Sequence, residues 1–147
     1  MINNVNTSIT EHFLNRLDQL HHGKPWHGKN WLDILGMGKE PFKPEIIRIV
    51  YHMIAWRKYT IAFLKGEKYD IDLNSTDDWP LVDADDYQVV EAFKTSQEEL
   101  IKAFAEFDER KWMKKAKGAK YTYAQLSEGL IDHDIYHSGQ IALLLKE

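Results

Sequence analysis

The segment TYAQLSEGLIDHDIYHSGQIALLLK, residues 122–146, has the period of one long amphipathic helix. It opens with a capping box, in which the side chains of Thr122 and Gln125 each accept a hydrogen bond from a backbone N–H. Side chains on one face then recur three and four residues apart, at Leu126, Leu130, His133, His137, Ile141 and Leu144. We therefore expect a helix whose buried face carries two imidazoles, one turn apart.

Three other long segments have the same helical period, at about 8–21, 45–65 and 84–110. The first begins with a capping box at Ser8, and the second has Pro44 in its first turn, where a missing N–H does no harm. A shorter helix is expected around 30–35, and the helix over 45–65 should be the most buried because it is apolar on more than one face. The long helices amount to roughly 60% of the chain, against about a third on average. The sequence thus predicts an all-α fold, a four-helix bundle.

The composition is that of one globular domain spanning residues 1–147, with 44% apolar and 29% charged residues. The net charge of −4 argues against a generally basic nucleic-acid binder. The absence of cysteine excludes disulfides, thiolate metal sites and cysteine nucleophiles, and it suits the cytosol. No segment has the length of a membrane span, and the start, MINNVNTSIT, lacks the features of a signal peptide. We expect a cytoplasmic protein that binds neither nucleic acid nor membrane.

The two histidines of the last helix indicate a metal site. An i, i+4 pair on one helical face places two ring nitrogens where they can bind one ion. The alternative is a pair of buried histidines satisfied by hydrogen bonds alone. A third ligand is offered by His52, which stands on a stripe of apolar spacing with Ile49 and Trp56 in the helix over 45–65. A His₃ site leaves a coordination position open for water or substrate.

Two other metal-site classes fit the sequence poorly. The run HDIYH at residues 133–137 has Asp134 where zincins carry glutamate, and no histidine follows it. A carboxylate di-iron bundle needs Glu-x-x-His pairs, and the chain has none. Because Asp134 directly follows His133, it points about 100° away. We expect it at the surface or hydrogen-bonded to a ligand, and not as a ligand itself.

Several further side chains are candidates for the surroundings of the metal. Some are close to the ligands in sequence and are expected to hydrogen-bond them or to line a pocket: Tyr51, Trp56, Tyr59, Tyr136 and Gln140. Trp26 and His27, in the connector after the first helix, are expected at the mouth of this pocket, unless they merely pin the connector.

The chain resembles the DinB-like superfamily of helical proteins. The run HDIYHSGQI at residues 133–141 is similar to the last-helix signature of that family, and VYHMIAW at 50–56 is similar to its second-helix histidine segment. The runs PWHG at 25–28 and DDWP at 77–80 resemble one branch of the superfamily. The similarity spans nearly the whole chain, in order.

This resemblance implies a four-helix bundle with long crossover connections and a divalent metal held by His52, His133 and His137. It also implies a homodimer. Members of the family with assigned activities include transferases and isomerases that use low-molecular-weight thiols. Imidazole ligands suit zinc, nickel or iron.

The sequence leaves three functions open. The preferred one is a metal-dependent enzyme on a small molecule, a thiol S-transferase or a related enzyme. A metal-dependent hydrolase and a non-catalytic metal-binding or stress-related interaction protein are the alternatives. A pocket beside the histidines favours an enzyme, and a closed site favours the non-catalytic protein.

Overall fold

The described part of this computed structural model, residues 7–116 and 118–146, is 63% helix and contains no β-strand. Its helices are α1 (Ile9–His22), α2 (Trp31–Leu35), α3 (Pro44–Leu64), α4 (Asp86–Glu106) and α5 (Tyr123–Lys146), with a short 3-10 turn over Glu109–Lys111. The all-α prediction is confirmed. The expectation of no signal peptide concerns residues 1–10, of which 1–6 lie outside the described residues.

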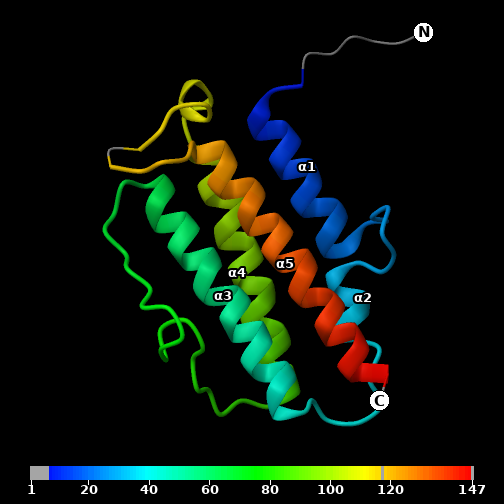
Figure 1. The fold of residues 1–147 in the computed structure, drawn as a ribbon. Coiled ribbons are helices and arrows are strands. Elements are labelled where there is room, and N and C mark those ends of the chain that lie inside the picture. Colours follow the sequence, from blue (N-terminus) through cyan, green and yellow to red (C-terminus); the bar gives the residue numbers. More distant parts are fainter. Residues whose placement is uncertain (1–6, 117, 147) are drawn as a thin grey trace, which may run out of the picture.

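The four long helices lie side by side (Figure 1), with α1 and α5 running in one direction and α3 and α4 in the other. Helix α3 packs against both α4 and α5, α1 packs against α4, and the short α2 contacts α1 and α5. Because α3 and α4 run parallel, residues 65–85 return along the outside of the molecule to join them (Figure 1). This crossover passes the middle of α3, where His52 stands.

Helix starts follow the local signals of the sequence. The Thr122 hydroxyl accepts from the N–H of Gln125 at 3.0 Å, and the Gln125 amide oxygen accepts from the N–H of Thr122 at 2.8 Å, so this capping box is confirmed. The Ser8 hydroxyl accepts from the N–H of Glu11 at 3.1 Å. Each bond satisfies a backbone group that the helix itself leaves unpaired.

Helix α4 is shorter than the predicted 84–110. It ends at Glu106 because Phe107 adopts an extended backbone, with φ −71° and ψ 138°. The Asp108 side chain then accepts from the N–H of Arg110 and begins a separate 3-10 turn.

The core is one hydrophobic cluster built from all five helices. Its largest fully buried apolar side chains are Trp31, Trp112, Phe13, Phe93 and Phe104. Helix α3 contributes more buried residues than any other helix, as predicted. Across the residues described, none of the helices combines the length and apolar character needed to span a bilayer.

Candidate metal centre

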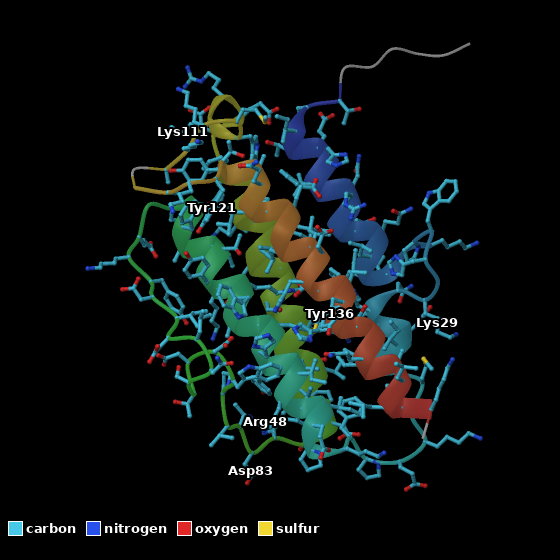
Figure 2. The ribbon with its side chains drawn as sticks, in the orientation of Figure 1. Lys29, Arg48, Asp83, Lys111, Tyr121 and Tyr136 are labelled. Atoms are coloured by element: carbon cyan, nitrogen blue, oxygen red, sulfur yellow. The ribbon has the colours of Figure 1, made fainter. Side chains whose placement is uncertain are left out.

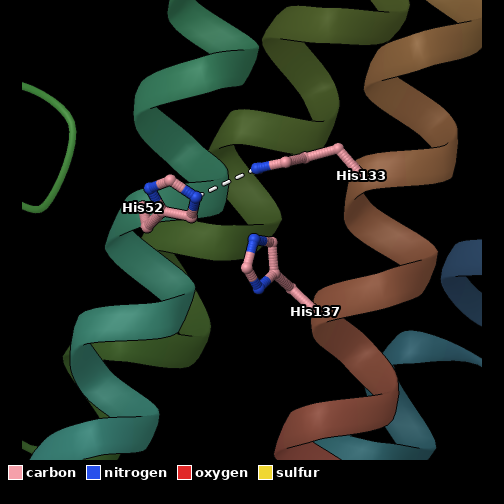
Figure 3. A group of neighbouring side chains, drawn as sticks. All are labelled: His52, His133 and His137. Carbon is pink, nitrogen blue, oxygen red and sulfur yellow. Dashed lines mark hydrogen bonds between the residues drawn. The ribbon is translucent and has the colours of Figure 1, made fainter. Parts of the chain in front are cut away.

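The structure brings together the three histidines expected to form a site (Figure 3). His52 comes from the middle of α3, and His133 and His137 stand one turn apart on α5. One ring nitrogen of each lies within 4.8 Å of the others. His52 and His137 are buried, and His133 is partly exposed. The group is therefore able to hold a metal ion, with one side open.

The His52 ring is oriented by Asp78. Its Nδ1 lies 2.7 Å from the backbone carbonyl oxygen of Asp78 and 3.1 Å from the carboxylate Oδ1 of the same residue. Both oxygens are acceptors, so Nδ1 is the nitrogen that carries the proton. The lone pair of a neutral His52 is then on Nε2, which faces His133 (Figure 3).

The other two rings follow the same pattern. Nδ1 of His137 donates to the amide oxygen of Gln140 at 2.7 Å, which leaves Nε2 as its free nitrogen. Nδ1 of His133 faces Oδ1 of Asp134 at 3.4 Å. Metal-bound histidines in proteins usually hold their second nitrogen against an oxygen in this way, which fixes the tautomer and the ring direction.

The distance between the Nε2 atoms of His52 and His133 is 3.0 Å. With Nδ1 of His52 already donating, the pair needs a proton on His133 or a cation between the rings to avoid facing lone pairs. Nitrogens bound to one tetrahedral zinc ion at about 2.0–2.1 Å lie roughly 3.3 Å apart. The donor set, and the spacing of this pair, thus fit one bound metal ion.

Burial favours the metal-binding form of two rings. Desolvation lowers the pKa of His52 and of His137 below the ordinary value, and the neighbouring His133 lowers both further. Neutral imidazole is the form that binds metal, so the lowered pKa values favour the metal-binding form of both rings at neutral pH.

The crossover supplies two residues whose roles the sequence did not reveal. Asp78 accepts from the indole N–H of Trp56 at 2.8 Å and from the N–H of Asn74 at 2.9 Å. Burial opposes its charged form, but these hydrogen bonds and the nearby His52 outweigh it and lower the pKa of Asp78. Trp79 stacks on the His52 ring, with centroids 3.7 Å apart and planes 3° from parallel. The only sequence signal was the DDWP run, to which no role was attached.

Asp134 corrects one sequence expectation. Its side chain is only 1% exposed, so the surface position is wrong, while its contact with His133 agrees with the other alternative. The reason is Arg57, a buried residue of α3 whose Nε donates to Oδ2 of Asp134 at 2.8 Å. The same guanidinium donates to the hydroxyl of Ser96 at 3.0 Å and lies over the Phe93 ring. Asp134, which follows the candidate ligand His133 on α5, is therefore part of a buried ion pair with Arg57 of α3.

Of the other candidate neighbours, Gln140 and Trp56 form hydrogen bonds at the site, and the three tyrosines lie around it. Gln140 accepts a hydrogen bond from His137, and Trp56 donates one to Asp78; the Trp56 ring lies 6.1 Å from that of His133.

Tyr136 is 66% exposed on the outside of α5 (Figure 2), although its ring is 5.2 Å from that of His137. Tyr59 packs against Trp56, and a hydrogen bond with Tyr121 raises its pKa to about 12. Tyr51 is half-buried and packs against the hydrophobic core.

Trp26 and His27 do not line the site. Trp26 is 99% exposed and His27 is exposed as well, both in the connector between α1 and α2. This connector lies on the opposite side of the molecule from the crossover (Figure 1), so the expectation of a pocket mouth there is wrong.

A cavity of about 370 Å³ adjoins the histidine cluster. Trp56 and Thr60 of α3 and His133 of α5 lie in its wall, and most of the lining is apolar. His133 thus belongs both to the histidine cluster and to the wall of a space of the size that small ligands occupy.

No family model, curated protein or solved structure matches this chain.

Proposed function

We propose that this chain is a DinB-like metal-binding protein and that it acts as a metal-dependent enzyme on a small molecule, with a low-molecular-weight thiol as co-substrate. In this proposal His52, His133 and His137 hold one divalent transition metal. The observation that carries it is the convergence of three imidazoles whose Nδ1 atoms all face oxygen atoms. The parallel pair α3 and α4, joined by a long crossover, agrees with the architecture that the family resemblance implies.

His52, His133 and His137 would hold the ion as neutral ligands, and its undiminished charge would lower the pKa of a thiol or water and polarise a carbonyl group. The chain's own residues prepare the site. Asp78 and Gln140 fix the protons of His52 and His137 on Nδ1, and Trp79 covers one face of His52 against water. The cavity beside His133 gives a substrate access to the partly exposed side of the cluster.

This cavity also favours an enzyme over a non-catalytic metal-binding protein. A site with only a structural role is closed by its ligands and by packing. Here two rings are buried while the third borders open space. The homodimer that the family resemblance implies stays a prediction, which sedimentation at several protein concentrations will check.

The first experiment measures metal content and coordination in protein prepared without an affinity tag. We expect about one divalent transition ion per chain and loss of most of it in His52→Ala, His133→Ala and His137→Ala. His12→Ala is the matched control, because His12 is an exposed histidine of α1. Full occupancy in His52→Ala would show that the third ligand lies elsewhere.

The second experiment measures catalysis. Metal-loaded protein should accelerate the reaction of small electrophiles with cellular thiols, relative to metal-free protein and to His137→Ala. The absence of cysteine makes this assay clean, since the protein contributes no thiol of its own. Equal rates in all three samples would support the non-catalytic alternative. A metal-dependent reaction that needs no thiol would support the hydrolase.

A further inference from the structure

The cavity beside His133 has a glycine in its wall. Gln125, Leu126, Gly129, Leu130 and His133 all line it from α5, at the three- and four-residue spacing of one helical face. Gly129 stands one turn before His133 on that face. Beyond the local backbone of α5, a Cβ added there would meet nothing within 4 Å, so the missing side chain leaves open space at this part of the cavity wall.

The opposite wall comes from α3 and from the connection before α5. Trp56 and Thr60 of α3 face the cavity, and Tyr121 borders it close to the start of α5 (Figure 2). Tyr121 is held in place by its hydrogen bond with Tyr59 and by packing against Phe63, whose ring centroid lies 5.9 Å away. The space is thus bounded on several sides by aromatic and aliphatic groups.

The lining of this cavity contains no charged side chain among the described residues, apart from His133 when it is protonated. A larger cavity of about 420 Å³ near Phe107 is different, because Lys65, Glu67 and Lys111 line it and none of the three histidines does. A charged ligand group in the cavity beside His133 would lose water and gain no ionic partner. An uncharged apolar group gains contact with the apolar walls instead.

We propose that this cavity binds the uncharged, apolar or aromatic body of the substrate, and that Gly129 sets the size of the group accepted. This inference deepens the proposed function. It rests on that function only in identifying the bound molecule as a substrate, because binding to the cavity itself requires no metal. His133 then contacts both the bound group and the other two histidines.

The test uses two probes with the same aromatic body. N-phenyl-1-naphthylamine is uncharged, and 8-anilino-1-naphthalenesulfonate adds one sulfonate to it. Both become fluorescent in apolar surroundings, and Trp56 in the cavity wall serves as an energy donor. Metal-free protein should bind the uncharged probe saturably, and the sulfonate at least tenfold more weakly.

Three glycine variants locate the binding. Gly129→Leu should weaken binding of the uncharged probe at least tenfold, and Gly129→Ala should have a smaller effect. Gly139→Leu is the control, since Gly139 is also a glycine of α5 with open space at its Cβ but lies outside the cavity wall. It should bind like the original protein. Circular dichroism of all variants verifies that they are folded.

Three outcomes would overturn the proposal: no saturable binding, equal binding by the Gly129→Leu and Gly139→Leu variants, or preference for the sulfonate. A further result would also overturn it: probe binding that is lost as the protein dimerises, with dimerisation measured by sedimentation. That result would assign the cavity to a second copy of the chain. Because the protein is metal-free, failure here is separate from failure of the metal site, which the metal content of the histidine variants tests.

Discussion

Gln140 orients the His137 ring by accepting a hydrogen bond from its Nδ1 at 2.7 Å, through the side-chain amide oxygen. Removal of such a partner typically lowers metal affinity 10–100-fold, because the ring loses its fixed tautomer and direction. We expect this loss for Gln140→Ala, measured by competition with a chelator. Gln140→Glu retains an acceptor oxygen and should restore most of the affinity. Equal affinity in the two variants would mean that this bond does not orient the ligand.

His21 is a buried histidine outside the metal site, and burial lowers its pKa to about 4. Between pH 6.5 and 4 the unfolded chain binds a proton at this residue that the folded chain rejects, so stability falls as the pH falls through this range. The contribution is at most about 3 kcal/mol. We expect His21→Leu to lessen the stability loss between pH 7 and pH 4.5, measured by urea unfolding. His27→Leu, at an exposed histidine of the connector, should leave that loss unchanged; a matching change in both variants would contradict the assignment.

The histidine cluster was accessible from the sequence because it depends on local periodicity. His52, His133 and His137 each occupy a position where helical spacing demands a buried side chain. The partners of these rings were less accessible. Asp78 reaches His52 across 26 positions, and Arg57 reaches Asp134 across 77. Contacts of this kind depend on how the crossover and helices pack, which local spacing does not encode.

At the scale of the helices, the Arg57–Asp134 pair ties α5 to α3, and Ser96 extends the network to α4. Arg57 is fully buried, so loss of its carboxylate partner leaves an uncompensated charge in the core. Breaking such a pair costs about 3–5 kcal/mol. We expect Asp134→Ala to lower the free energy of unfolding of metal-free protein by about 3 kcal/mol or more.

Urea unfolding measures this change, and the same helix offers a control. Asp132 is exposed, so Asp132→Ala should change stability by no more than about 0.5 kcal/mol. The double variant Arg57→Met, Asp134→Leu removes both charges and should recover much of the loss. A double variant as unstable as Asp134→Ala would indicate that packing, and not the unpaired charge, causes the loss.

Helix ends show which local signals are sufficient. Thr122 and Gln125 begin α5 as predicted, because a capping box is complete within four residues. The end of α4 was predicted too late because apolar spacing continues to Phe107, which still packs on the core from an extended backbone. A residue can therefore keep its place in the periodic pattern after the helix has ended.

At the scale of the whole molecule, the candidate metal site joins three separate parts of the fold. His52 lies on α3, His133 and His137 lie on α5, and Asp78 and Trp79 of the crossover cover His52. An ion bound at this point holds these parts together only when the chain is folded. Metal binding and folding are then coupled, and a ligand at 100 times its dissociation constant stabilises the fold by about 2.7 kcal/mol.

This coupling has a defined pH dependence. The pKa values of His52 and His137 are lowered by burial, so both rings are neutral at pH 7.5 and protons compete with the metal only below about 6.5. The increase in melting temperature caused by zinc should therefore be complete at pH 7.5, and it should shrink as the pH falls through the lowered pKa values. In His133→Ala, zinc should raise the melting temperature little at pH 7.5 or below, whereas His12→Ala should behave like the original protein. A zinc effect of constant size from pH 8 to pH 5 would mean that carboxylates bind the ion. Because imidazolium has no free lone pair, an ion held by these three rings has to be released as they become protonated.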